Sequence, residues 1–246
     1  SGDFLYKDLS FNLNFKPKIA GVFKTQIDID ENTFLKGAFS SDKSFELILT
    51  SPYIEFDNLS LENVDVKITN NSGSLKFKKV DSKLFNGDDF VINTFFEDDV
   101  TNFDIDFNTS KGKNQLNFNH TIDKNMRSLI SFSKISFDYN NNRWVLDESS
   151  EINKNKFIFN NDYKELKSTK IKSGRQTIEF KYLNNENKFD FQSIFKSVNF
   201  SSLIPKPKNI LYDGIVNGKV SLTKTGNIYS GKSNIVLKDF SSNGYI

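Results

Sequence analysis

Few residues in this 246-residue chain could carry chemistry. Its single histidine, His120, follows Leu116 and Phe118 at even spacing, which places the three side chains on one face of a strand. A catalytic histidine needs an orienting partner and a nucleophile nearby. As the lone histidine of the chain, His120 is better explained as a structural residue near the end of a strand.

Two pairs of aspartates have the spacing that a calcium or acid–base site would use. Asp28 with Asp30, and Asp104 with Asp106, are two residues apart, so each pair shares one strand face. Both pairs alternate with apolar residues, and the solvated face of a strand explains them better. We therefore expect no metal site in either place.

Lysines form two loose basic runs. One contains Lys164, Lys167, Lys170 and Lys172, and the other contains Lys76, Lys78 and Lys79. Either run could touch anionic lipid head groups. A solvated strand edge that lysines protect from aggregation is the favoured interpretation.

The composition excludes several classes of function. The chain has no cysteine, so it has neither disulfides nor a thiolate metal site. Its 33 basic and 31 acidic residues give a net charge of +2, too weak for an electrostatic nucleic-acid interface. No phosphate-binding loop, nucleophile elbow or metal-ligand spacing is present. We predict a protein that is not an enzyme, has no cofactor, and acts in binding, transport or structure.

The residue types and their alternation predict an all-β fold. Phenylalanine occurs 26 times, whereas alanine occurs only at positions 20 and 38. Apolar residues alternate with Asn, Asp, Lys and Ser along almost the whole chain, as in Phe103, Ile105 and Phe107. Turn residues recur every 10–13 positions, which fits about 18–20 short antiparallel strands. No run of 18 apolar residues predicts a membrane-spanning helix.

Three local features stand out within this pattern. The strand that begins at Phe45 is expected to stop before Ser51-Pro52. Residues 199–204 predict a single helical turn, with Ser201 as its N-cap and Pro205 closing it. Residues 210–246 read as three short strands, separated by turns at 224–227 and at 239–244.

Twisted sheets of more than about ten strands curl, split or close. So many consecutive strands therefore favour a long, mostly antiparallel meandering sheet that curls lengthwise into an apolar-lined trough. A pair of packed sheets, a β-sandwich, is the alternative. The scarcity of small residues on the inward positions favours the trough, since a sandwich core needs them to interdigitate. The residues expected to line the interior are Phe103, Ile105, Phe107, Leu116, Phe118, Ile135, Phe137, Trp144, Leu146, Phe157, Phe159, Ile178, Phe180, Phe189, Phe191, Val220, Leu222, Ile235 and Leu237.

No shift in composition marks a domain boundary. The stretch Pro205-Lys-Pro-Lys208 is the only segment that resembles a linker. We expect a continuous trough segment over residues 1–204, and a C-terminal strand unit over 205–246 that continues it. The start and the end of the sequence indicate a segment of a longer chain.

Several stretches resemble a known family. Residues 212–222, Tyr-Asp-Gly-Ile-Val-Asn-Gly-Lys-Val-Ser-Leu, followed by Gly226 and by residues 230–240, resemble the glycine-punctuated repeat of AsmA-like proteins. The preceding residues 198–205 are similar to the short element that comes before that repeat. Residues 45–64, 141–147 and 173–180 look like the middle of TamB-type proteins, the translocation and assembly module proteins, of Bacteroidota.

This resemblance implies a role in lipid transport and outer-membrane biogenesis. TamB-type proteins are anchored in the inner membrane, span the periplasm, and meet an outer-membrane assembly-factor barrel, TamA or a relative, through a C-terminal domain. Their bodies are β-sheet troughs thought to carry phospholipids along an apolar inner wall. We expect the anchor and the C-terminal domain to belong to parts of the protein outside this sequence.

Two functions therefore remain open. The first is a trough segment that conducts phospholipids between the two membranes. The second is a structural β-rod, or a surface that shelters outer-membrane strands by β-augmentation.

Overall fold

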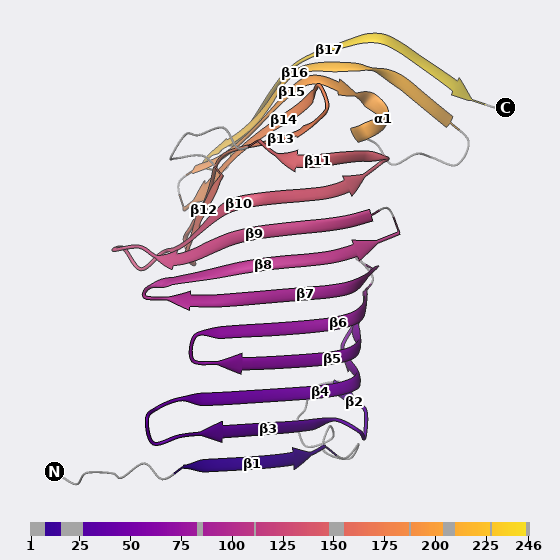
Figure 1. Ribbon diagram of the computed structural model, residues 1–246. Helices are drawn as coiled ribbons and strands as arrows, with labels where there is room; N and C mark the ends of the chain where they lie inside the picture. The colour runs from indigo at the N-terminus through magenta and orange to yellow at the C-terminus, as the bar shows by residue number, and fades with distance from the viewer. Residues whose placement is uncertain are drawn as a thin grey trace. The chain divides into compact units, whose positions relative to one another are not determined.

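The computed structural model describes residues 8–15, 27–82, 86–110, 112–147, 155–186, 188–203, 210–226 and 228–244. These residues form a 17-stranded, antiparallel, meandering sheet and one helical turn (Figure 1). The prediction of an all-β fold with a long antiparallel sheet is thereby confirmed. The chain divides into two compact units, residues 1–115 and 116–246.

The first unit contains β1 (Leu9–Asn14), β2 (Ile27–Ile29), β3 (Phe34–Phe39), β4 (Phe45–Phe56), β5 (Leu59–Thr69), β6 (Ser72–Ser82), β7 (Asn86–Glu97) and β8 (Val100–Thr109). Strand β9 (Gly112–Ile122) extends across the division between the two units. The second unit contains β10 (Ser128–Tyr139), β11 (Asn142–Leu146), β12 (Lys156–Phe159), β13 (Tyr163–Ser173), β14 (Gln176–Asn185), β15 (Lys188–Asn199), α1 (Phe200–Leu203), β16 (Ile210–Thr225) and β17 (Ile228–Gly244).

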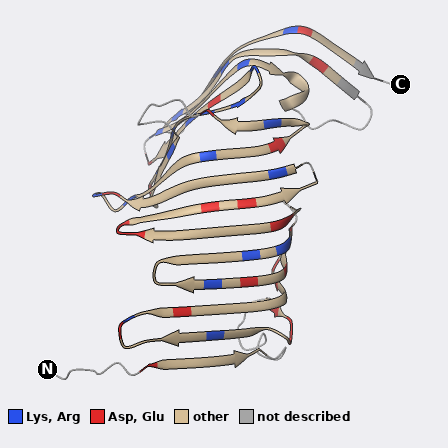
Figure 2. Cartoon of the chain, viewed as in Figure 1, with Lys and Arg blue, Asp and Glu red and all other residues tan. Residues whose placement is uncertain are grey.

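In the first unit, strand register places apolar residues in continuous cross-strand rows. Residues directly opposite each other on antiparallel strands share a face of the sheet. One row crosses seven strands without a polar side chain, and it consists of Leu13, Leu35, Leu49, Val66, Leu75, Ile92 and Ile105. A row on the other face contains Asn12, Lys36, Ile48, Lys67, Ser74, Asn93 and Asp104. The alternation seen in the sequence is therefore a two-faced sheet, with charges at isolated positions along its strands (Figure 2).

Bulges interrupt this alternation at recurring places. Asn63, Asp89, Ser197 and Asp239 adopt left-handed backbone conformations, with φ between 50° and 51°. Strand register shifts beside Asp89, beside Ser197 and beside Gly214. An extra residue in one strand redirects the side chains that follow it. On β15, for example, the apolar side chains of one face are at odd positions up to Phe195, and the next one, Val198, is at an even position.

The core of the second unit is a small cluster at one end of its sheet. Trp144, Ile178, Val198 and Val216 are buried in it, with at most 6% of each residue exposed. Partly buried residues around it include Phe200 and Leu203 of α1, so the helical turn packs onto the sheet at this point.

Three local expectations from the sequence are wrong. Strand β4 runs through Pro52, which lies where β4 exchanges its neighbour β3 for β2, so no ladder hydrogen bond requires its missing N–H. The segment after residue 209 forms two long strands and not three, because Gly231 continues β17 by pairing with Leu222. The helical turn is present, but Ser201 lies inside it and does not precede it.

Candidate binding face

The second unit carries a face built from four cross-strand rows, here called the apolar face. Each row follows from the register of β10 to β17. The first row is Leu146, Ile171, Ile178, Phe195, Gly218 and Ile235; the second is Thr169, Phe180, Ser193, Val220 and Ser233; the third is Ile130, Phe157, Leu166, Tyr182, Phe191, Leu222 and Gly231; the fourth, the rim row, is Ser128, Phe159, Lys164, Asn184, Phe189, Lys224 and Tyr229.

The register thus brings many of the predicted lining residues together on this face. Trp144 pairs with Phe137 beside the first row, and Leu237 pairs with Val216. Aromatic rings contact each other along it: Phe157 stacks on Phe159 with ring centroids 5.0 Å apart, and Tyr182 meets Phe189 edge-on at 5.8 Å.

Burial of the apolar face decreases from β11 towards β17. Trp144, Leu146 and Ile178 are only 2%, 4% and 6% exposed, so they are core residues that a ligand cannot reach. Phe180, Phe189 and Phe191 are half-buried. Leu222, Ile235 and Leu237 are 45%, 41% and 38% exposed. The apolar surface that a ligand could cover therefore lies mainly between β14 and β17, and the half-buried Phe157 and Phe159 of β12 extend it.

A polar network closes the core end of the face. The Gln176 side chain donates to Asn142 Oδ1 (2.9 Å) and accepts from the backbone N–H of Asn199 (2.9 Å). Asn142 in turn donates to Ser202 Oγ (2.9 Å). These bonds tie β11 and β14 to α1, so they hold the helical turn over the Trp144 cluster; Gln176 and Ser202 of this network are buried.

One hydroxyl on the apolar face has no hydrogen-bond partner among the described residues. Ser193 is 2% exposed, and its Oγ is unpaired. It stands between Phe180 and Val220 in the second row. Burying an unpaired hydroxyl costs about 1–3 kcal/mol, so Ser193 is a local weakness of the fold.

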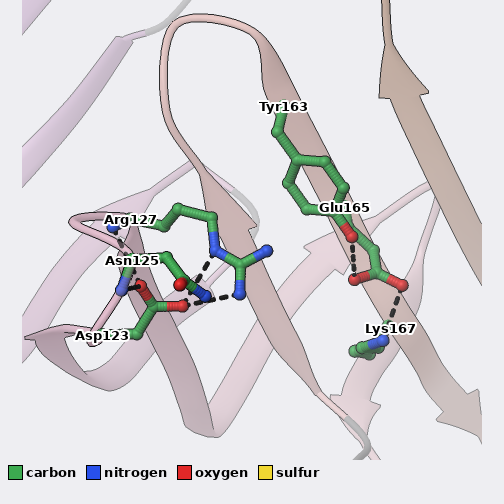
Figure 3. Close-up of polar contacts among 6 residues, drawn as sticks. All are labelled: Asp123, Asn125, Arg127, Tyr163, Glu165 and Lys167. Atoms are coloured by element: carbon green, nitrogen blue, oxygen red, sulfur yellow. Dashed lines mark hydrogen bonds and ion pairs between the residues drawn. The ribbon is translucent and has the colours of Figure 1, made fainter. Parts of the chain in front are cut away.

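The opposite face of the second unit carries a cluster of charged side chains (Figure 3). Asp123 pairs with Arg127 (2.7 Å), whose guanidinium lies 5.2 Å from the centre of the Tyr163 ring. Tyr163 donates to Glu165 (2.6 Å), which also pairs with Lys167 (2.6 Å). A hollow of about 600 Å³ opens next to this cluster, lined also by Glu179, Lys181 and Asp190.

The electrostatics of this cluster follow from its contacts. Burial, aided by the hydrogen bond to Glu165, raises the pKa of Tyr163 from 10.0 to about 12. Burial acts to raise the pKa of Glu165, but the hydrogen bonds from Lys167 and Tyr163 outweigh it and the pKa is lowered. The hydrogen bond from Arg127 lowers the pKa of Asp123. Each charge in this cluster has a nearby partner of opposite charge or a hydrogen-bond donor.

A second hollow lies at the turns beside the rim row. Its volume is about 640 Å³, and it is lined by Met126, Ser128, Phe159, Asn160, Asn161, Asp162 and Lys164. Met126 is 79% exposed, and nearby Ile122 is 57% exposed. At the turn between β16 and β17, Ile228 and Tyr229 are 74% and 72% exposed. This end of the second unit thus combines exposed apolar side chains with lysines.

The remaining predicted lining residues lie on β8, β9 and β10. In the first unit, Ile105 ends the uninterrupted apolar row, Phe103 pairs with Thr94, and Phe107 stacks on Phe90 at 4.8 Å. Phe118 contacts Phe132 edge-on at 6.1 Å. Leu116 and Ile135 are half-buried.

The residues with candidate chemistry remain apart. Asp104 and Asp106 point to the polar face, where Asp106 accepts from Gln115 (2.7 Å) and lies 3.5 Å from Lys113. Asp28 lies opposite Glu55, and His120 is half-buried in β9. Within the described ranges, no group of three or more His, Asp or Glu side chains could hold a metal ion.

Lys164 and Lys224 are the residues whose placement the sequence did not indicate. Both lie on the apolar face, whereas Lys167, Lys170 and Lys172 pair with carboxylates. The even spacing of Val220, Leu222 and Lys224 could have revealed Lys224. For Lys164, the bulge between Leu166 and Thr169 interrupts the even spacing that would have connected it to Ile171 on the same face.

Comparisons with known proteins identify no relative: no family model, no curated protein and no solved structure matches the chain. In the part of the chain that the structure describes, no helix has the length and apolar character needed to span a membrane.

Proposed function

We propose that this chain is a segment of a periplasmic, inner-membrane-anchored protein that conducts phospholipids towards the outer membrane along an apolar groove. In this proposal the chain belongs to the TamB-like proteins, it acts as a conduit and not as an enzyme, and other parts of the protein meet a TamA-like barrel. The resemblance of residues 45–64 and 212–240 to that family motivates the assignment.

One observation carries the proposal: apolar residues form continuous rows across successive strands, and the part of the face on β14 to β17 stays half-exposed. Acyl chains are held by contact with apolar surface and not by directed bonds, so such rows suit a ligand that slides. A large apolar surface that remains exposed marks a site for a ligand or a partner.

Consecutive positions on opposite faces provide the test. A photo-crosslinking amino acid would be placed at Phe191 or Leu222 on the apolar face, and at the adjacent Gln192 or Ser221 on the other face. Cells that express each variant are irradiated, and lipid attached to the purified protein is identified by mass spectrometry. We expect phospholipid at Phe191 and Leu222 only. Equal capture at the paired positions would rule out the apolar face as a lipid path.

A second function is favoured by the long edge strand β17. It runs over 17 residues, and its described side chains, from Ile228 to Ser242, are all exposed. In this reading the chain is a β-rod, or it shelters outer-membrane strands that add to this edge. Native mass spectrometry of the purified protein separates the two functions. Bound phospholipid supports the conduit, and a lipid-free protein that binds an unfolded outer-membrane protein supports the shelter.

A further inference from the structure

The apolar face of β12 to β17 contains two charged residues, and both are lysines in the rim row. Lys164 is opposite Phe159 and Asn184, and Lys224 is opposite Phe189 and Tyr229. Every other charged residue that pairs in register on these strands lies on the opposite face. The face is therefore apolar along its length and cationic at one end, where the strands reach their turns.

The surroundings of the two lysines leave their charges available. Among the described residues neither lysine has an ion pair, whereas Lys167, Lys170, Lys181 and Lys188 all do. Lys224 lies 5.1 Å above the ring of Tyr229, and Lys164 is exposed at the rim hollow. Asp162 also lines that hollow, but it belongs to the turn and not to the apolar face.

Apolar surface and cation together define the ligand. We propose that the rim row selects anionic phospholipids: Lys164 and Lys224 contact the phosphate-bearing head groups, while the acyl chains lie on the rows behind them. The two lysines are three strands apart, about 14 Å at the usual strand spacing, so each serves a separate lipid. At Lys164, Phe159 and Met126 would cover the part of the acyl chains next to the head group.

This inference rests on the proposed function, and it adds the charge of the head group as the selected property. Cations near an anionic lipid contribute about 1 kcal/mol each, which corresponds to about a fivefold change in affinity. At physiological ionic strength charges are screened beyond about 8 Å, so head groups must lie close to the lysines for the selection to operate.

The test uses water-soluble dioctanoyl phosphatidylglycerol and dioctanoyl phosphatidylcholine, which share their acyl chains and differ in head-group charge. Binding to the purified chain is measured by calorimetry for wild type, for Lys164→Gln/Lys224→Gln, and for Lys219→Gln/Lys232→Gln. The last variant removes the same charge from the opposite face of β16 and β17. We expect wild type and this control to prefer phosphatidylglycerol at least about fivefold, and the rim variant to lose that preference while still binding phosphatidylcholine.

Three results would overturn the inference. Equal binding of the two lipids to wild type, or an equal loss in the control variant, shows that the rim lysines do not select the head group. Binding of free glycerol phosphate as tight as that of the lipid shows a site for soluble phosphate. Absence of binding for both lipids removes the proposed function itself, and with it this selection.

Discussion

Gly218 lies where β16 and β17 approach too closely for any side chain. It adopts φ +141°, and an added Cβ would overlap the backbone oxygen of Asn234 and lie 2.9 Å from both the Asn234 carbonyl carbon and the Ile235 Cα. These are backbone atoms of the paired strand, so no flexible side chain can move aside. Gly218→Ala must therefore shift β17 or break the pairing.

The cost of this substitution has two parts. An unfavourable backbone conformation costs about 1–3 kcal/mol, and overpacking costs a further 1–3 kcal/mol, so the two together cost roughly 2–6 kcal/mol. With a urea dependence of about 2 kcal/mol per M, the unfolding midpoint should fall by about 1–3 M. Trp144 is the only tryptophan of the chain and is 2% exposed in the core of the second unit. Its fluorescence therefore reports the unfolding of that unit.

Gly226→Ala is the matched control. Gly226 also has a positive φ, +59°, but nothing lies within 4 Å of an added Cβ. Only the conformational cost of about 1–2 kcal/mol remains, so the midpoint should fall by roughly 0.5–1 M. If both variants unfold at the same urea concentration, the close approach at Gly218 does not contribute, and the reasoning from strand spacing is refuted.

Four further predictions use the same fluorescence or lipid capture. The pKa of Tyr163 is about 12 in the folded state and 10.0 in the unfolded chain. The contribution of Tyr163 to the free energy of unfolding is therefore complete below pH 10 and is lost as the pH rises to about 12. Tyr163→Phe should reduce the loss of stability between pH 10 and pH 12. Gln176→Leu removes the partner of Asn142 Oδ1 and of the Asn199 N–H, and should destabilise the second unit by about 1–3 kcal/mol with faster hydrogen exchange in α1. Ser193→Ala should raise the urea midpoint, since it removes a buried unpaired hydroxyl; an unchanged or lower midpoint contradicts this. Leu222→Asp should abolish co-purified phospholipid at an unchanged midpoint, while Ser221→Asp on the opposite face retains it.

Much of the architecture was predictable because strand alternation is a local property. Isoleucine 105 and its neighbours show the two-residue period directly, and turn residues separate the strands. The helical turn was predictable from the local sequence as well, although not with Ser201 as its N-cap. The polar-face positions of Asp104 and Asp106 also follow from the period alone.

The errors arose where a neighbouring strand decides the outcome. Pro52 looks like a strand terminator, yet β4 continues because its partner changes at that residue. Gly231 looks like a turn, yet its pairing with Leu222 keeps β17 extended. The bulges at Asp89, Ser197 and Asp239 shift the apolar positions by one. An apolar pattern that jumps from odd to even positions beside Asn or Asp is the signal that could have located them.

The sequence by itself determined the class of the fold and the two-faced character of its strands, since both depend on residue type and a fixed period. Only the tertiary structure decided which predicted lining residues are dry core and which remain exposed, because burial depends on α1 and on strands distant in the chain. Trp144 and Leu222 obey the same alternation, yet one is 2% and the other 45% exposed. The same holds for Lys164 and Lys224, which are 60 positions apart and come onto one row only through the register of four strands.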